Sequence, residues 1–477
     1  MVELKWKNQM AEQRELNSAT NHRKPIASDS MPVHHNFVED SADPLKLNQS
    51  DCLAYEQYLH LGRLWALSRS RQFPEWRNEP LLKPSLQALE ITFRFISLVL
   101  SDPRPYINKS EWKRRLESLA CLQIELIASI CEDDEDDREN IASCSAPTVN
   151  LHLSNGVLTR GGSLQEVWKI NGASSALVSQ TSEQSLLPRL GAWQKSQDIA
   201  SKLWFSIECH FQRAPFTLGL GEPNLSGKPV LEYDLVCKPS EVHSLKRSPL
   251  DPHLNNHENQ SLYTTHQIRE SWLITAQELL KRIHETLESK DFKASAKNCW
   301  LLEKIWKLLA EIEDLHLLMD PDDFLRLKKQ LAIKTPTDSG AFCLRSRVLM
   351  AVSEACKDLK HRVPAILGVE ADPSGGPSLQ EEAMRLYHGH GNWSSIHLLQ
   401  ALQAIEAGLK KFFFSYQQLV IVVMGSSEAM GSHGNPRNGA LSQLFMDPPY
   451  FPSLDAAKTF LGDFWQYEAK AASVRFS

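Results

Sequence analysis

The chain has 477 residues, of which 42% are apolar and 23% are charged, so it can bury a sizeable core and wholesale disorder is excluded. Its formal net charge of -6 disfavours nucleic acid as the main partner, because a protein that neutralises phosphates usually carries a basic excess. Nine scattered cysteines form no C-x-x-C pair, which argues against a disulfide framework or a zinc knuckle and favours a reducing compartment.

The first 50 residues are rich in serine, asparagine, histidine and charge, and they show no sustained periodicity. This composition predicts a disordered tail over 1–50. The N-terminal segment also lacks the apolar core of a signal peptide. The most apolar stretch, 412–424, is too short for the ~20 residues that span a bilayer. We therefore expect a cytoplasmic protein with no membrane contact, and the nucleus stays open as a second location.

An N-terminal helical region is predicted over 51–131. Pro84 suits the first turn of a helix whose apolar residues recur every three or four positions as far as Leu100. A second helix is expected to open at 108–110 and to carry its apolar stripe to Ile130. The short connection between the two predicts an antiparallel pair.

An acidic run over 132–137 opens a segment that is dominated by serine, glycine and asparagine. Like charges at this density repel one another and favour an extended, solvated chain. We interpret 132–165 as an acidic, serine-rich linker, although the acidic run could also bind a cation or a basic partner.

A C-terminal helical domain is predicted over 166–470. Apolar stripes at helical spacing run over 268–287, 301–319, 344–359 and 396–423. Ser378 and Glu381 form a capping-box pattern, and Gly425 is a natural helix stop. The only strand candidates are the short runs 149–153 and 230–236. The expected fold is therefore mostly α, a multi-helix bundle-type domain behind a disordered tail.

No complete active site is visible, since the Walker loop, the G-x-S-x-G elbow, the H-E-x-x-H pair and the Rossmann glycine pattern are all missing. A Pro- and Asn-rich stretch that we interpret as a polar loop, not a metal site, contains His243, His253, His257 and His266. Glycines at 389 and 391 could bring the backbone close to a ligand or simply end a helix. The Gly/Ser-rich loop over 425–435 could cradle an anion or serve as a connection. We expect no catalytic residues, no metal and no cofactor.

Several long runs, spread over most of the chain beyond the tail, resemble one plant family. They are AYEQYL at 54–59, FPEW at 73–76, KPSLQALE at 83–90, LSDPRPYIN at 100–108, GHGNW at 389–393 and DPPYFP at 447–452. These runs resemble the plant HSPRO, nematode-resistance-like, proteins. The resemblance implies a positive regulator of basal resistance and stress responses, linked to the regulatory subunit of the plant Snf-related energy-sensing kinase. The family has no agreed catalytic residues.

Shorter segments are similar to the indoleamine dioxygenase family. Arg213 precedes a Gly-x-Pro-x-Leu turn at 221–225, as does the arginine that holds the substrate carboxylate in that family. Tyr416 and Gln417 fall where the family has Tyr-His, and that histidine binds haem iron. The resemblance implies a dioxygenase-like fold with Arg213, Tyr416 and Gln417 near a ligand. Gln417 departs from the pattern, because its amide cannot replace the imidazole.

Two main hypotheses follow, and a third is a hydrolase whose nucleophile and base are adjacent in space but not recognisable from their spacing in the sequence. The first is a non-enzymatic regulator of plant defence signalling that acts by protein–protein interaction. The second is a protein that binds haem or an indole-type small molecule on a degenerate dioxygenase-like fold, with Arg213 able to pair a carboxylate.

Overall fold

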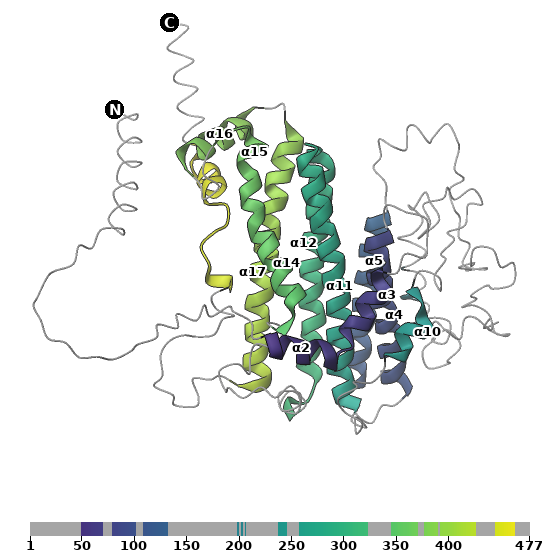
Figure 1. The fold of residues 1–477 in the computed structure, drawn as a ribbon. Helices are drawn as coiled ribbons and strands as arrows, with labels where there is room; N and C mark the ends of the chain where they lie inside the picture. Colours follow the sequence, from purple (N-terminus) through teal and green to yellow (C-terminus); the bar gives the residue numbers. More distant parts are fainter. Residues whose placement is uncertain are drawn as a thin grey trace, which may run out of the picture. The chain divides into compact units, whose positions relative to one another are not determined.

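Helices dominate the structure, a computed structural model, and none of the residues that it describes forms a strand (Figure 1). The prediction of a mostly α fold is therefore confirmed. Residues 1–48 of the predicted tail, the linker 132–165 and both strand candidates lie outside the described residues. Those are 49–69, 79–101, 108–131, 237–245, 257–322, 345–370, 376–389, 392–425 and 444–462, with single positions between 198 and 206.

Five long helices carry most of the core. They are α4 (Glu79–Ser101), α5 (Lys109–Cys131), α11 (His257–Glu288), α12 (Phe292–Asp314) and α17 (Trp393–Met424). Helix α17 packs on α12, α12 on α11, α11 on α4, and α4 on α5, while α5 also contacts α12 (Figure 1). One continuous hydrophobic cluster runs through all five helices.

Helices α4 and α5 form the antiparallel pair that the sequence predicts. The rings of Phe95 and Trp112 lie 5.4 Å apart, and further along the pair Gln123 Nε2 donates to Thr92 Oγ1 at 2.8 Å. Between these two contacts the residue number on α5 rises while the residue number on α4 falls, so the two helices run in opposite directions. Gln123 Oε1 also accepts from Trp272 Nε1 of α11 at 2.9 Å, which ties the pair to the central helix.

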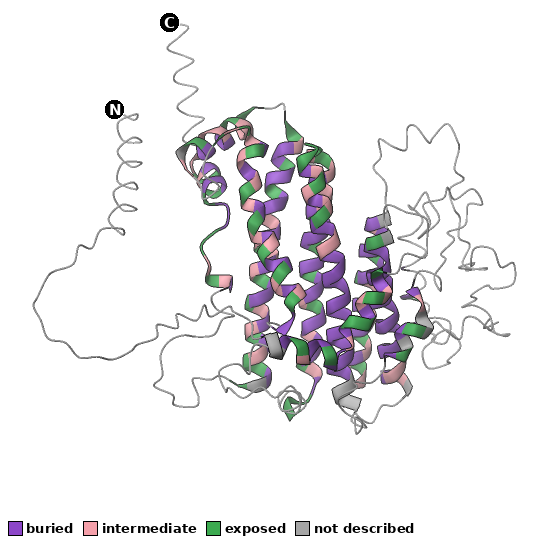
Figure 2. Ribbon diagram, viewed as in Figure 1, coloured by how far each residue is buried: buried purple, intermediate pink, exposed green. Residues whose placement is uncertain are grey.

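Helix α11 is buried on every side over 261–276 (Figure 2). A surface helix buries one stripe of apolar residues, whereas a central helix must also find partners for its polar ones. Gln267 Nε2 donates to the Leu59 carbonyl at 2.9 Å, and the Ser271 hydroxyl donates to the Gln267 carbonyl at 2.9 Å. The buried polar residues of α11 therefore find partners both in other elements and in the main chain of α11 itself.

Shorter helices surround this core. Helices α3 and α10 contact α4, and α14 contacts α11 and α17. Helices α2 and α3 meet at His60, whose φ of 55° lies in the left-handed region. The bounds are α2 (Gln49–Tyr58), α3 (Leu61–Arg69), α10 (Pro239–Ser244), α14 (Arg347–Asp358), α15 (Val363–Leu367) and α16 (Pro377–His388), with 3-10 turns η4 (Leu315–Leu318) and η7 (Leu359–Arg362). Residues 452–462 are also helical.

The predicted start of α4 is wrong. The helix begins at Glu79, so Pro84 lies inside it and not in its first turn. A proline at an interior position removes one main-chain hydrogen bond. Leu81 and Leu82, each 1% exposed, lie before Pro84, and we attribute the extra turn to the burial of this apolar pair.

The predicted capping box at the start of α16 is also wrong. The N-cap residue is Gly376, which makes no side-chain cap, and Ser378 lies within the helix. Pro377 explains the difference, because its fixed φ suits the first helical position and starts the helix ahead of Ser378.

Two glycine stops are confirmed. Gly425 ends α17 with a φ of 83°, and its N–H donates to the Ile421 carbonyl at 2.9 Å. A positive φ is the conformation that glycine adopts at least cost. Gly389 follows α16, and its N–H donates to the Arg385 carbonyl at 2.8 Å. The helix-ending interpretation of Gly389 therefore holds.

Helices from the predicted regions 51–131 and 166–470 contact each other directly, as α4 with α11 and α5 with α12. The segment proposed to divide them lies outside the described residues, so the four-part division stays a prediction. Among the helices of the described part of the chain, none combines the length and the apolar character that crossing a membrane requires.

Candidate functional site

A cluster of buried polar side chains lies where α2, α11, the end of α12 and the start of α14 meet. We call it the buried polar cluster. Each member is at most 2% exposed, which is unusual for ionisable groups, because charged side chains are almost never fully buried unless they are paired. Its members are Tyr55, Thr265, His266, Arg269, Glu270, Glu313, His316 and Ser346.

Local helix geometry explains how short stretches supply several members at once. His266, Arg269 and Glu270 are three and four residues apart on α11, so their side chains project from one side of that helix. Glu313 is near the end of α12 and His316 follows in η4, again three residues on. The change from α12 to a 3-10 turn thus places a carboxylate and an imidazole side by side.

Arg269 holds the cluster together electrostatically. Its Nη1 donates to Glu313 Oε1 at 2.7 Å, while Nη2 donates to the Tyr55 hydroxyl and lies 3.3 Å from Glu270 Oε1. Glu270 in turn accepts from the Tyr55 hydroxyl at 2.9 Å through Oε1 and from the Ser346 hydroxyl at 2.9 Å through Oε2. One buried cation therefore faces two buried carboxylates.

The orientation of His316 follows from its neighbour Thr265. The Thr265 hydroxyl lies 3.0 Å from the Ser261 and Leu262 carbonyls, to which it can only donate. The same hydroxyl oxygen lies 2.8 Å from His316 Nε2, so we infer that Nε2 carries the proton and Thr265 accepts it. His316 Nδ1 is then the ring nitrogen that faces Glu313 Oε2, at 3.0 Å.

The charges within the cluster shift several pKa values. Burial alone would raise the pKa of Glu313, but Arg269 and His316 outweigh it and hold that pKa well below the usual range. Burial raises the pKa of Glu270, although Arg269 and Ser346 oppose the shift. Burial also raises the pKa of Tyr55 well above its ordinary value. Arg269 and Glu313 consequently form a buried ion pair.

His266 differs from the other members, because neither of its ring nitrogens makes a hydrogen bond within the described part of the chain. Its ring is 1% exposed and lies 5.2 Å from the ring of His316 and 5.9 Å from that of Tyr55, measured between centroids. Burial, Arg269 and His316 together hold the pKa of His266 well below its ordinary value, against the opposing effect of Glu313. The imidazole is therefore neutral, with a lone pair available.

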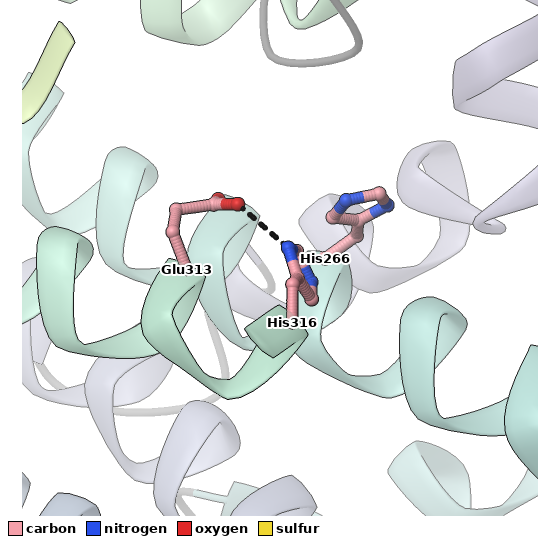
Figure 3. A group of neighbouring side chains, drawn as sticks. All are labelled: His266, Glu313 and His316. Carbon is pink, nitrogen blue, oxygen red and sulfur yellow. Dashed lines mark ion pairs between the residues drawn. The ribbon is translucent and has the colours of Figure 1, made fainter. Parts of the chain in front are cut away.

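This arrangement brings together side chains that can ligate a cation. One atom each from His266, Glu313 and His316 lies within 4.8 Å of the other two (Figure 3). Imidazole nitrogen and carboxylate oxygen are common metal ligands in proteins. The expectation that the chain has no metal site stays a prediction that nothing in the structure tests.

The loop interpretation of His266 is wrong. His266 lies in α11, which begins at His257, and His243 lies in α10, so the stretch is helical at both places. The apolar stripe used to place the helix begins only at Ile268, because the four residues directly before it, 264–267, are polar yet buried. The spacing of Glu313 and His316 at a helix end was a signal in the sequence that could have pointed to the cluster.

The structure describes two of the three residues that the dioxygenase resemblance pointed to, Tyr416 and Gln417. Arg213 is outside the described residues. Tyr416 is buried on α17, where its ring stacks on Phe412 at 6.3 Å, and it interacts electrostatically with Arg269. Gln417, the next residue, is half-buried. Their proposed roles around a ligand, with Arg213, stay a prediction.

We expect the His266→Gln variant to lose less stability than the wild type as the pH falls from 7 to 5. In the unfolded chain the imidazole takes up a proton below its ordinary pKa, about 6.5. In the folded protein it stays neutral among Arg269, Glu313, His316 and Tyr55. The unfolded state then binds more protons, so His266 lowers the free energy of unfolding by up to about 1.4 kcal/mol per pH unit.

The measurement is a series of urea titrations across this pH range in the presence of EDTA. The comparison is between the slopes of the free energy of unfolding against pH in the wild type and the variant. Their difference reports on His266, since every other titrating group is common to both proteins. Equal slopes would show that His266 is not held neutral by the folded structure.

Comparison with known proteins assigns both parts of the chain to one family. A family model described as Hs1pro-1 N-terminus matches residues 1–208, and one described as Hs1pro-1 protein C-terminus matches residues 211–467. The chain is 46% identical to nematode resistance protein-like HSPRO2 of Arabidopsis thaliana, over 98% of this chain and 100% of that protein. It is 48% identical to HSPRO1 of the same plant, over 87% and 90%. No solved structure matches, so the dioxygenase-like fold stays a prediction.

Proposed function

Because the chain belongs to the Hs1pro-1 family, we propose that it is a non-enzymatic regulator of plant basal defence and stress signalling that acts by binding another protein. The names of its two Arabidopsis relatives support the link to resistance, and neither names an enzymatic activity. The partner that we propose is the regulatory subunit of the plant Snf-related energy-sensing kinase, and the proposed place of contact is the cytoplasm.

The observation that carries this proposal is an exposed apolar surface at the C-terminal end of α17. We call it the α17 apolar strip, and its members are Phe414, Ile421, Val422 and Met446. Val422 is 71% exposed and Met446 76% exposed, while Phe414 packs edge-on against Phe445 with ring centroids 5.4 Å apart. Exposed apolar side chains that gather on one face of a helix mark protein interaction sites more often than scattered single residues do.

Helical spacing accounts for the strip. Phe414 and Ile421 are seven residues apart and Phe414 and Val422 eight, so all three share one face of α17. The buried face of the same helix, which includes Phe412, Phe413 and Leu419, packs into the core instead. Helix α17 therefore presents apolar side chains on two sides, and only one of them packs into the core.

Charged groups flank the strip. Lys357 Nζ pairs with Asp447 at 2.8 Å, and Lys410 Nζ pairs with Glu406 at 2.8 Å. An apolar centre with a polar rim is the usual composition of a protein–protein interface. The strip thus has the composition expected of a docking surface.

We expect the double variant Val422→Asp/Met446→Asp to bind the kinase's regulatory subunit at least tenfold more weakly than the wild type, a loss of about 1.4 kcal/mol or more. Both side chains are largely exposed, so neither substitution disturbs the core. The measurement is the Kd between purified components by isothermal titration calorimetry.

Trp393→Asp is the matched control, since Trp393 is 60% exposed at the opposite end of α17. It should bind like the wild type. Absence of wild-type binding at micromolar concentration would reject the partner, whereas binding that survives the double substitution would reject the surface.

A further inference from the structure

The buried polar cluster contains three ligating atoms arranged around a common point. His266 contributes a ring nitrogen from α11, Glu313 an oxygen from α12, and His316 a ring nitrogen from η4 (Figure 3). All three side chains are at most 2% exposed. A surface group of acidic residues is commonplace, but two imidazoles and a carboxylate that converge inside a helical core are not.

His266 supplies an independent sign of a ligand. A buried polar atom without a partner costs about 1–3 kcal/mol, so proteins rarely leave one unsatisfied. His266 leaves both ring nitrogens without a hydrogen bond within the described residues, although it is 1% exposed. One of these nitrogens lies within 4.8 Å of ligating atoms of Glu313 and His316. The side chain is thus directed into the group without a partner of its own.

We propose that His266, Glu313 and His316 bind a zinc ion that ties α11 to the end of α12. Two histidines and one glutamate form a ligand set that suits zinc, with a water molecule in the fourth position. Ligating atoms about 2.0–2.2 Å from a tetrahedral ion lie about 3.3 Å from one another. His316 Nδ1 and Glu313 Oε2 already lie 3.0 Å apart, and one ring nitrogen of His266 lies within 4.8 Å of a ligating atom of each residue.

Neighbouring residues already orient two of the proposed ligands. Thr265 accepts a hydrogen bond from His316 Nε2, which leaves Nδ1, 3.0 Å from Glu313 Oε2, as the nitrogen that would bind the ion with release of its proton. Arg269 Nη1 holds Glu313 Oε1 at 2.7 Å, which leaves Oε2 for the ion. Outer partners of this kind fix the tautomer and the direction of metal ligands.

The charges of the cluster are compatible with a divalent cation. Both histidines must be neutral to bind a metal, so in the occupied site Glu313, Glu270 and Arg269 would contribute one net negative charge and the zinc ion would bring the total to one positive charge. The repulsion between Arg269 and the ion is reduced because Glu270 lies 3.3 Å from the guanidinium. A zinc ion would also satisfy the lone pair of His266.

The test is the zinc content of the full-length protein after dialysis against a weak chelator. We expect the wild type to retain about one zinc ion per chain, and His266→Gln to retain much less. His284→Gln is the matched control. His284 lies on the same helix, and its Nδ1 lies 2.7 Å from the Leu280 carbonyl, away from the cluster. This control should retain zinc like the wild type.

Cobalt substitution identifies the ligands. We expect the wild type to show the visible absorption of tetrahedral cobalt without a thiolate charge-transfer band, since the proposed ligands include no sulfur. If His266→Gln does not fold, as judged by circular dichroism, Thr265→Val replaces it as the test variant. Loss of the outer hydrogen bond to His316 should then weaken zinc binding by about 10–100-fold.

Three results would overturn the proposal. The first is a wild-type protein without zinc after reloading. The second is a cobalt spectrum with a thiolate band, which would place the metal on cysteine. The third is zinc binding that is unchanged in folded His266→Gln or in Thr265→Val.

Discussion

Replacing Arg269 with methionine is expected to lower the free energy of unfolding by about 3–5 kcal/mol. The guanidinium is fully buried and donates to Glu313 and Tyr55 while facing Glu270. Methionine preserves most of the volume but removes the charge, so two buried carboxylates lose their cation. An unpaired buried charge cannot be rehydrated, which makes breaking such a pair costly.

The measurement is urea denaturation in the presence of EDTA, followed by the fluorescence of the buried Trp272 and Trp306. Arg347→Met is the matched control, because Arg347 also pairs with a distant glutamate, Glu56, but is 53% exposed in its side chain. Exposed ion pairs contribute little, so this control should change stability far less. Equal losses in the two variants would show that burial of the pair is not what makes Arg269 important.

A double variant separates the effect of the lost charge on stability from the effect of the lost packing. Arg269→Met/Glu313→Gln removes both members of the 2.7 Å pair, so no unpaired charge remains at Glu313. We expect the double variant to be more stable than Arg269→Met alone, because removing both members of a buried pair costs less than removing one. If the double variant is less stable than Arg269→Met alone, the packing of these side chains, and not their charge, determines the stability of the cluster.

The sequence predicts the helices that bury a single face and fails where a helix is buried on all sides. The stripe from Leu86 to Leu100 correctly indicates α4, because its apolar residues recur at the helical period. The beginning of α11 has no such stripe. Thr264 and Gln267 are at most 2% exposed, and their polarity indicates a loop unless their partners are known.

Most of the buried polar cluster could not be predicted, for the same physical reason. Arg269 and Glu313 are 44 residues apart in the chain, and Tyr55 and Glu270 are 215 apart, so their contacts depend on how the helices pack. Only spacings within one helix, such as that of Glu313 and His316, are visible in one sequence. The three residues inferred from the dioxygenase resemblance rest on short motifs that no solved structure yet supports.

Replacing Gly408 with leucine is expected to destabilise the protein by about 3 kcal/mol, the upper part of the range for overpacking. Gly408 lies in the middle of α17, where glycine costs about 1 kcal/mol relative to alanine. Close packing explains its presence. A Cβ atom at Gly408 would lie 3.3 Å from Trp306 Cβ and 3.9 Å from the Glu303 carbonyl oxygen. Trp306 is 1% exposed on α12, so a leucine side chain at 408 would have to displace a residue that is packed on all sides.

Leucine at 408 should therefore push α17 away from α12, and so weaken the most extensive helix pair of the core. The measurement is urea denaturation, with Gly62→Leu as the matched control. Gly62 is also helical, but a Cβ atom there would meet nothing within 4 Å. The better helix propensity of leucine should stabilise that variant by up to about 1 kcal/mol. The two substitutions thus have opposite expected signs. If both are stabilising, Gly408 does not pack against Trp306 as closely as the structure places it.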